Sequence, residues 1–243
     1  MEATAAFAKA LDEKDPLKSF RDRFHIPKDK KGEELIYLCG NSLGLQPKSV
    51  KAMMDQELDD WAHLGVEGHH HAKTPWLPYH ESVTKDLATV VGAKNIEVVA
   101  MNSLTVNLHL FLISFYQPTS KRFKIVIEEG AFPSDSYAVE SHVKLHDQKA
   151  DETILWVKPR PGEFLIREDD MLELIQREGE SIALLLLPGV QYYTGQVFPM
   201  KKLTDAAHGK GCRIGFDLAH AVGNVPLQLH DWNVDFAVWC SYK

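Results

Sequence analysis

The second half of the chain alternates short apolar runs with segments of helical spacing, and this alternation limits the folds open to it. Apolar runs predict strands at residues 124–128, 153–157, 182–187, 212–216 and 236–240, with helices such as 169–177 and 199–210 between them. Continuous apolar runs of this length are typical of strands buried on both faces, and helical connections join parallel strands. The pattern therefore predicts an α/β fold with an open, mostly parallel sheet and helices on both faces.

In the first half we predict two further strands at residues 35–38 and 98–101, which makes about seven in all. Helices are predicted at 15–24, 47–64 and 78–91, and another ends near Tyr116. The helix at 47–64 carries Met53, Met54, Leu58 and Trp61 at helical spacing, and we expect this face to pack in a core. We divide the chain into a helical segment, residues 1–34, and a ligand-binding domain, residues 35–243.

Charge and cysteine content exclude several classes of function. The chain has 243 residues and a net charge of −7 without a basic stripe, so nucleic acid is not an expected partner. Its three cysteines are widely spaced, which favours free thiols in a reducing compartment over a disulfide framework. The acidic start does not resemble a signal peptide, and no apolar run is long enough to span a membrane. We therefore expect a cytoplasmic protein.

Two of the predicted strands lead directly into residues that can carry chemistry. The run at 212–216 is followed by Asp217, and the run at 236–240 is followed by Ser241, Tyr242 and Lys243. Ligands of open α/β sheets lie beyond the carboxyl ends of the strands. An aspartate and a lysine placed there suit pyridoxal phosphate, since the lysine forms a Schiff base and the aspartate keeps the pyridine nitrogen protonated. A helix-capping or ion-paired aspartate and a solvated terminal lysine are the alternatives.

Two strand-to-helix loops are further candidates. Residues 102–105 precede a helix, whose free N–H groups and threonine hydroxyl can bind a phosphate; alternatively, Ser103 or Thr105 only caps the helix. The second loop contains Phe132 and opens another helix. An aromatic residue at such a point is ordinarily part of the core or of a hydrophobic staple.

The run Gly68-His69-His70-His71 invites a metal hypothesis, which its spacing disfavours. Neighbouring side chains diverge in a strand and do not share a helix face. We expect no metal site here, but a solvated loop with one histidine facing a ligand.

Several literal segments resemble the kynureninase family, the pyridoxal-phosphate hydrolases of tryptophan degradation. They are FDLAHAVGN and WCSYK near the end of the chain, and YLCGNSLGLQPKSV, MNSLTVNLHL, FPSDSYAVES, YYTGQ and HDWNVDFA before them. The resemblance runs from about Asp15 onward and favours the animal members. It implies the large domain of a fold type I enzyme, a cytoplasmic homodimer, and hydrolysis of L-kynurenine or its 3-hydroxy form to an anthranilate and L-alanine.

The resemblance assigns roles to the residues at the end of the chain. Lys243 would carry the cofactor and take the α-proton of the substrate, and Asp217 would pair with the ring nitrogen. Tyr242 would donate a proton and contact the cofactor phosphate. His220 would orient Asp217 or touch the ring, and a hydrogen-bonded core histidine is the alternative for this residue considered alone.

The same resemblance implies further contacts to cofactor and substrate. Ser42 and His69 are candidates for the aryl or carbonyl end of the substrate, and His69 holds a position where the family has a histidine after a glycine. Pro188 departs from the family, which tends to have a serine whose hydroxyl contacts the cofactor. The cofactor residues implied are Leu104 and Thr105 at the phosphate, Phe132 stacked on the ring, and Pro133, Ser134 and Asp135 beside it.

Two alternatives accompany this reading. A cysteine desulfurase would share the fold, but such enzymes typically stack a histidine where this chain has Phe132, and no cysteine candidate for a mobile loop is seen. The second alternative follows from the end of the chain at Lys243. Family members continue into a small C-terminal domain that grips the substrate carboxylate, so we expect that domain to be missing. The chain would then be an inactive form that acts only by pairing with a full-length subunit.

Overall fold

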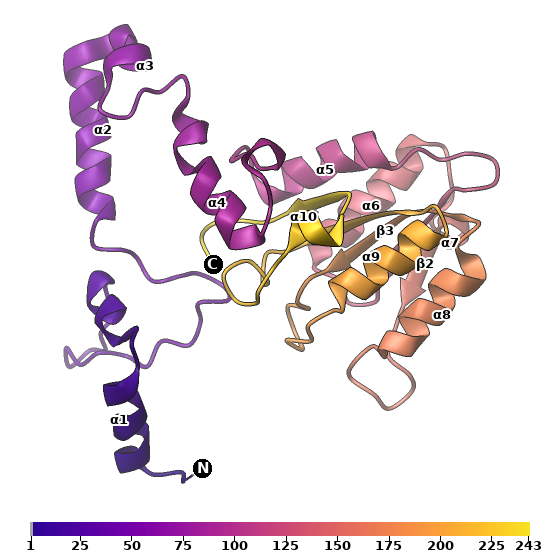
Figure 1. Cartoon of the computed structure of the whole chain (residues 1–243), viewed down its shortest axis with the longest axis horizontal. Helices are drawn as coiled ribbons and strands as arrows, with labels where there is room; N and C mark the ends of the chain where they lie inside the picture. The colour runs from indigo at the N-terminus through magenta and orange to yellow at the C-terminus, as the bar shows by residue number, and fades with distance from the viewer. Residues whose placement is uncertain (1) are drawn as a thin grey trace. The chain divides into compact units, whose positions relative to one another are not determined.

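The computed structural model describes residues 2–243 and contains two compact units. The first comprises the chain up to Tyr79 together with Tyr242 and Lys243, and the second comprises His80–Ser241. In Figure 1 the first unit is indigo to purple, apart from its two yellow C-terminal residues, and the second runs from magenta to yellow. Residues 35–79 thus lie in the same compact unit as the N-terminal segment, and the boundary between residues 34 and 35 stays a prediction.

The second unit is built on a five-stranded sheet in the order β2-β1-β3-β4-β5. All four strand pairings are parallel, as predicted. The chain first adds β2 on one side of β1 and then adds β3 on the other, so the strand order reverses between β1 and β3. Such a switch point is where open sheets bind ligands. The strands are β1 (Lys124–Glu128), β2 (Ile154–Val157), β3 (Ile182–Pro188), β4 (Arg213–Asp217) and β5 (Phe236–Val238).

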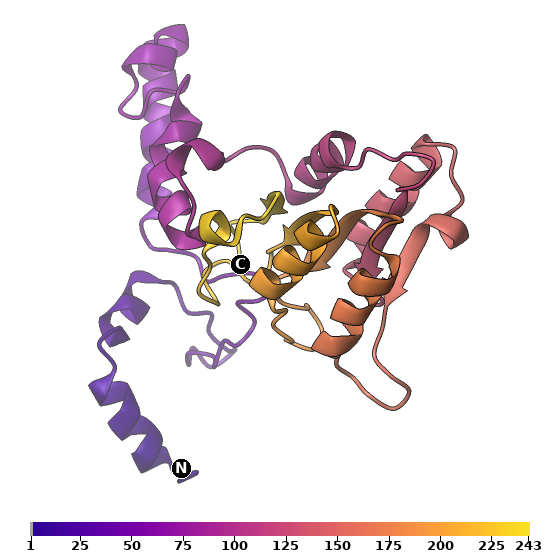
Figure 2. The ribbon, with the colours of Figure 1, turned by 45° about the vertical axis from the view of Figure 1, so that its right-hand side comes forward.

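Helices cover both faces of this sheet (Figures 1 and 2). On one face α5 and α6 pack on β1 and β3 through residues such as Leu108 and Val139. On the other face α8 and α9 contribute Ile175 and Leu203 to a second apolar cluster. The helices of this unit are α4 (Thr84–Val91), α5 (Leu104–Phe115), α6 (Pro133–Leu145), α7 (Ala150–Thr153), α8 (Glu168–Glu178), α9 (Met200–Gly209) and α10 (Leu229–Trp232), with 3₁₀ turns Tyr79–Val83 and Asn95–Glu97.

The sequence of β3 explains its central position. Leu184 and Leu186 belong to the cluster under α5 and α6, whereas Leu185 and Leu187 belong to the cluster under α8 and α9. Successive side chains of a strand point to opposite faces, so a continuous leucine run supplies both layers. The prediction of a doubly covered sheet is thus confirmed.

Gly215 in β4 leaves room for the ring of its neighbour in β5. Gly215 pairs with Phe236, and a Cβ atom on Gly215 would lie 2.1 Å from Cζ of that ring. Gly215→Ala should therefore lower the free energy of unfolding by about 1–3 kcal/mol or more, because the core must shift to admit the methyl group. Denaturant unfolding measures this change. Gly209→Ala, in α9 with no atom within 4 Å of the added Cβ, should not destabilise the chain.

The first unit consists of helices joined by irregular chain and contains no part of the five-stranded sheet. Its elements are α1 (Ala5–Lys14), a 3₁₀ turn Lys18–Arg23, α2 (Val50–Leu64), a 3₁₀ turn Gly65–Glu67 and α3 (Gly68–His71). The strand predicted at 35–38 is wrong, because Ile36 and Leu38 are 90% and 84% exposed and pair with no strand. In the second unit the predicted strand at 98–101 is likewise irregular chain, so the sheet has five strands and not seven.

Helix α2 corrects a second expectation. It forms at the predicted position, but Met53, Met54, Leu58 and Trp61 are all more than half exposed. Helical spacing identified the helix correctly but not a core for this face. The three histidines after it also differ from the expected loop, since His69, His70 and His71 form an exposed helical turn, α3. Residues 2–243 contain no group of three side chains suited to hold a metal ion.

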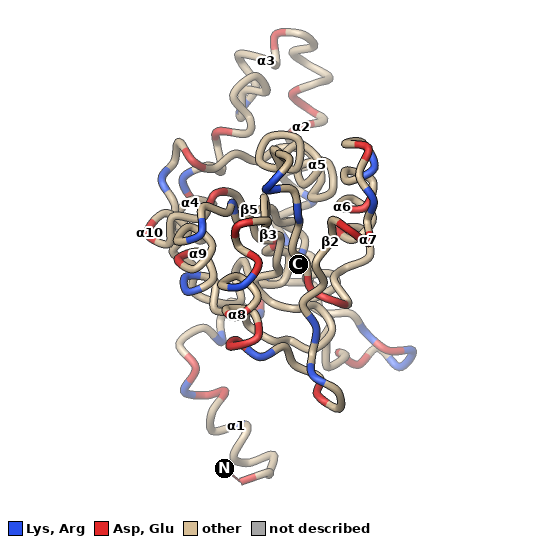
Figure 3. Tube along the Cα trace, turned by 90° about the vertical axis from the view of Figure 1, so that its right-hand side faces the viewer, with Lys and Arg blue, Asp and Glu red and all other residues tan. Residues whose placement is uncertain are grey.

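Figure 3 shows residues of both charge signs interspersed along the chain. Within the described part of the chain, no helix has the length and apolar character needed to cross a membrane.

A buried histidine between α5 and α6 should make the second unit sensitive to acid. His142 is 3% exposed, its Nε2 is without a hydrogen-bond partner among the described residues, and its ring lies 5.0 Å from that of His146. Burial first, and then His146 and His109, lower the pKa of His142. The folded state therefore keeps this ring neutral, and its stabilising contribution is present above the unfolded pKa of about 6.5 and lost as the pH falls below it.

His142→Leu should reduce this acid sensitivity. Between pH 7 and pH 5.5 the wild type should lose up to about 1.4 kcal/mol of unfolding free energy per pH unit from this residue, and the variant should not. Denaturant midpoints at several pH values measure the difference. His70→Leu, at an exposed position, is the matched control and should follow the wild-type profile.

Candidate active site

Asp217 lies at the carboxyl end of β4 and is held by the backbone around it. Its Oδ1 accepts a hydrogen bond from the Ala219 N–H at 2.7 Å, and its carbonyl accepts one from the Gly189 N–H at 2.8 Å. The N–H of Leu218 continues the ladder to Val238 of β5. The side chain of Asp217 is thus fixed at the edge of the sheet where α/β proteins bind ligands, as predicted.

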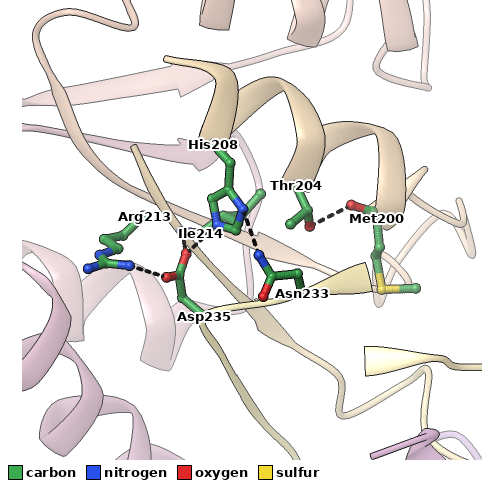
Figure 4. Close-up of polar contacts among 7 residues, drawn as sticks. All are labelled: Met200, Thr204, His208, Arg213, Ile214, Asn233 and Asp235. Atoms are coloured by element: carbon green, nitrogen blue, oxygen red, sulfur yellow. Dashed lines mark hydrogen bonds and ion pairs between the residues drawn. The ribbon is translucent and has the colours of Figure 1, made fainter. Parts of the chain in front are cut away.

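The segment between β4 and β5 is anchored by a second aspartate (Figure 4). Asp235 accepts hydrogen bonds from Arg213, from the Ile214 N–H and from His208, at 2.7–2.9 Å. These contacts tie the start of β4 to the approach to β5. They fix the base of the strand that ends in Asp217, so their role is structural.

Asp135 lies in the first turn of α6, where it meets Asp217. It is 5% exposed, shares a hydrogen bond with Asp217, and accepts one from the Ser134 hydroxyl at 3.2 Å. Burial, followed by the charge of Asp217, raises the pKa of Asp135 to about 8. A protonated Asp135 can therefore donate to an ionised Asp217 near neutral pH.

Glu128 is a second buried carboxyl at this edge, beside Asp135, and sequence reasoning did not identify it. It is the last residue of β1 and is 3% exposed. Burial, and then the charge of Asp217, raise the pKa of Glu128 to about 8. The signal in the sequence was an acidic residue directly after the apolar residues Ile125–Ile127, at a position where a charge is costly to bury.

Aromatic side chains flank the start of α6. Phe132 precedes the helix and is 47% exposed, and Pro133 occupies its first position, where proline is favoured. The ring of Phe132 meets that of Tyr192 edge to face, with centroids 5.3 Å apart. Phe132 is thus not a core residue, and it offers an accessible aromatic surface to a flat ligand.

The loop that carries Tyr192 is organised by Gln191, a buried residue that sequence reasoning also missed. Its Oε1 accepts from the N–H groups of Tyr193 and Thr194 at 2.6 and 2.8 Å. Its Nε2 donates to the Gly130 carbonyl at 2.9 Å, which ties this loop to the one before Phe132. An amide with both ends engaged sets the position of the aromatic pair.

The amino terminus of α5 is the candidate phosphate site. Ser103 caps the helix by accepting from the Val106 N–H at 3.5 Å, so the capping interpretation is correct for this residue. Leu104 and Thr105 occupy the first two helical positions and are half-buried. N–H groups at the start of a twelve-residue helix favour an anion.

His220 and Pro188 are two further predicted residues near the carboxyl ends of β3 and β4. His220 is half-buried three residues beyond Asp217, and its carbonyl accepts from Asn224 at 3.1 Å. Pro188 is the last residue of β3 and pairs in register with Asp217. The residue after it, Gly189, supplies the N–H that reaches the Asp217 carbonyl. Pro188 therefore leaves the backbone support of Asp217 intact.

The remaining predicted residues belong to the first unit. The Tyr242 carbonyl accepts from the Gly44 N–H at 2.7 Å, and Lys243 Nζ lies 5.8 Å from the centre of the Tyr242 ring. Ser42 is exposed, and its N–H donates to the Cys39 carbonyl. His69 packs edge to face on Trp76 at 5.6 Å. The strand predicted to reach Cys240 ends at Val238, so Lys243 lies five residues beyond β5.

The structure therefore brings Asp217 and Asp135 together, adds Glu128 to them, and places Tyr242 beside the 42–44 turn. The donor set of the second unit fits pyridoxal phosphate: a held carboxylate for the ring nitrogen, an aromatic face and a helix terminus for the phosphate. The fold and the candidate site agree with the family to which the sequence is matched. Residues 36–243 match the model described as Aminotransferase class-V, which covers most of the chain, and the chain belongs to that family.

Within this family the chain is similar to proteins named kynureninase. It is 55% identical to that of Myxococcus xanthus over 242 residues, covering 100% of this chain and 57% of the relative. It is 51% identical to the kynureninase of Rattus norvegicus, covering 97% and 53%. The chain thus spans just over half the length of these relatives. The predicted resemblance is confirmed, although these identities do not favour the animal members.

Solved structures confirm the fold class. A cysteine desulfurase from Escherichia coli superimposes with a TM-score of 0.69 at 18% identity, covering 92% of this chain and 54% of that one. A cysteine desulfurase from Thermococcus onnurineus gives 0.67 at 19% identity, covering 86% and 50%. Identities this low establish a common fold and say nothing of a common substrate.

Proposed function

We propose that this chain provides the cofactor-binding region of a pyridoxal-phosphate-dependent hydrolase that cleaves L-kynurenine or 3-hydroxy-L-kynurenine to an anthranilate and L-alanine. The observation that carries the proposal is the 51–55% identity to kynureninases over nearly the whole chain. The desulfurase alternative has only a shared fold behind it.

In this proposal the residues of the second unit hold the cofactor. When bound, pyridoxal phosphate supplies a protonated ring that accepts electrons from the substrate. Asp217, supported by Ala219 and Asp135, holds the proton on the ring nitrogen, and His220 assists it. Phe132 packs on the ring, and Pro133, Ser134 and Asp135 line its edge. Leu104 and Thr105 bind the phosphate at the start of α5.

The residues of the first unit handle attachment, proton transfer and substrate. Lys243 attaches the cofactor covalently and, when released, accepts the α-proton of the substrate through its neutral amine. The Tyr242 hydroxyl donates a proton to the carbon from which the acyl group leaves, and contacts the phosphate. Ser42 and His69 face the aryl and carbonyl end of the substrate. Before the bond to the acyl group breaks, water adds to the γ-carbonyl of the substrate, and its oxygen becomes part of the carboxyl group of the anthranilate product.

The test is turnover. The purified chain with pyridoxal phosphate should convert kynurenine to anthranilate, followed by fluorescence, with an equal amount of alanine. Comparing kcat/KM for kynurenine and its 3-hydroxy form ranks the two substrates. If the chain binds the cofactor but releases no anthranilate, activity of these residues by themselves is contradicted. Restored turnover on mixing with an inactive full-length relative would then support the pairing alternative.

We further propose that the chain acts in the cytosol as a homodimer. The free thiols Cys39, Cys212 and Cys240 are compatible with a reducing compartment. Light scattering of the cofactor-loaded chain should give twice the mass of one chain, and a monomer mass would contradict this.

A further inference from the structure

Glu128 stands apart from the other carboxyls because of its place in the sheet. It ends β1, one side of the switch point between β1 and β3, where open sheets bind their ligands. It is 3% exposed, whereas the next residue, Glu129, is exposed. Burying an ionised carboxyl is costly, so the protonation state of Glu128 matters at this ligand-binding edge.

Burial and hydrogen bonding together decide which of the three carboxyls carries the negative charge. Asp217 has the Ala219 N–H and its bond with Asp135, and Asp135 also has the Ser134 hydroxyl. The Glu128 carboxyl has its own backbone N–H. Glu128 and Asp135 are only 3% and 5% exposed, whereas Asp217 is half-buried and accepts a backbone N–H. A negative charge therefore costs least on Asp217.

We propose that Glu128 is a positioning residue that keeps a proton, so that Asp217 is the single anion presented to the pyridinium nitrogen of the cofactor. This inference rests on the proposed function. Were Glu128 ionised, its charge would draw a proton onto Asp217 and weaken the charge-assisted hydrogen bond to the ring.

The groups that face Glu128 agree with this role. Asp217 approaches from β4 and Asp135 from α6, and both are acids. The raised pKa of Glu128, about 8, keeps its carboxyl neutral at pH 7. A pyridinium beside Asp217 cancels the charge that is the smaller cause of this raised pKa, whereas burial, the larger cause, remains. Glu128 should therefore keep its proton at pH 7 in the loaded protein and release a fraction of it only near pH 8.

The first test needs no cofactor. A carboxyl whose folded pKa lies above its unfolded value stabilises the fold at low pH and loses that contribution as the pH rises toward 8. Between pH 5.5 and 7.5 the unfolding equilibrium constant of the wild type should therefore rise about tenfold per pH unit more steeply than that of Glu128→Gln. Glu129→Gln removes a neighbouring exposed carboxyl and should keep the wild-type slope.

The second test uses pyridoxamine 5′-phosphate, which needs no lysine bond. Calorimetry at pH 8 in two buffers of different ionisation enthalpy counts the protons released on binding. The wild type and Glu129→Gln should release a larger fraction of a proton than Glu128→Gln, whose affinity at pH 7 should stay within about threefold of the wild type.

Equal proton release and equal pH slopes in Glu128→Gln and the wild type would overturn the inference and leave the proposed function standing, provided that binding depends on Asp217. Failure of the wild type to bind pyridoxamine phosphate would instead overturn the proposed function. The stability slope would then still decide whether Glu128 holds a proton.

Discussion

Lys243→Ala should abolish reductive trapping of pyridoxal phosphate on the C-terminal peptide. In the wild type, borohydride should fix about one phosphopyridoxyl group per chain on Lys243, because a specific site concentrates the aldehyde next to one amine. Alanine has no nitrogen to form the bond, so the label on this peptide should fall to background. Peptide mass spectrometry of the reduced, digested chain measures the outcome.

Lys73→Ala is the control, because Lys73 is an exposed lysine of the same unit. It should leave the label on Lys243 unchanged. Labelling scattered over surface lysines and unaffected by Lys243→Ala would contradict a specific cofactor site. In a chain that turns over kynurenine, Lys243→Ala should also lower kcat by at least about three orders of magnitude, as expected for a group that forms the covalent bond.

Asp217→Asn should weaken binding of pyridoxamine 5′-phosphate by about a hundredfold. The asparagine keeps the shape of the side chain and loses the charge, and charge-assisted hydrogen bonds contribute about 1.5–3 kcal/mol. Without the anion, the ring nitrogen also loses the reason to stay protonated at neutral pH. Equilibrium dialysis measures the dissociation constant, and the absorbance of the bound ring reports its protonation.

Asp231→Asn removes an exposed carboxylate from α10 and should bind pyridoxamine phosphate like the wild type. Equal affinities of Asp217→Asn and the wild type would show that the cofactor does not use this edge of the sheet. Asp217→Asn should also lower the pKa of Asp135, since the charge that helps to raise it is gone.

The sheet was predictable because the apolar pattern of its strands indicates burial on both faces. The leucines of β3 fill both apolar clusters, and only a strand between two helical layers needs such a run. The run at 35–38 looks similar, yet it lacks a partner strand, and Ile36 is 90% exposed. Apolar character indicates a tendency to pair, but a pairing depends on what the rest of the chain brings alongside.

Residues of the candidate site were predictable where the local sequence around a single residue indicates its role. Asp217 follows a buried run directly, and Asp135 belongs to a segment shared with a known family. Glu128 and Gln191 were missed because their roles depend on residues that are distant in the sequence and close only in the folded chain. Glu128 matters through the charge of Asp217, and Gln191 through Gly130, sixty-one residues away. A local sequence pattern does not indicate a contact between residues so far apart in the chain.

The fit of Phe236 against Gly215 has an evolutionary consequence. The phenylalanine ring fills the space that a side chain at position 215 would need, and Gly215 lies two residues before Asp217 in the same strand. Neither position is then free to change independently. Among related chains, a larger residue at position 215 should be accompanied by a smaller one at position 236, so the two positions should covary even though twenty residues separate them in the sequence.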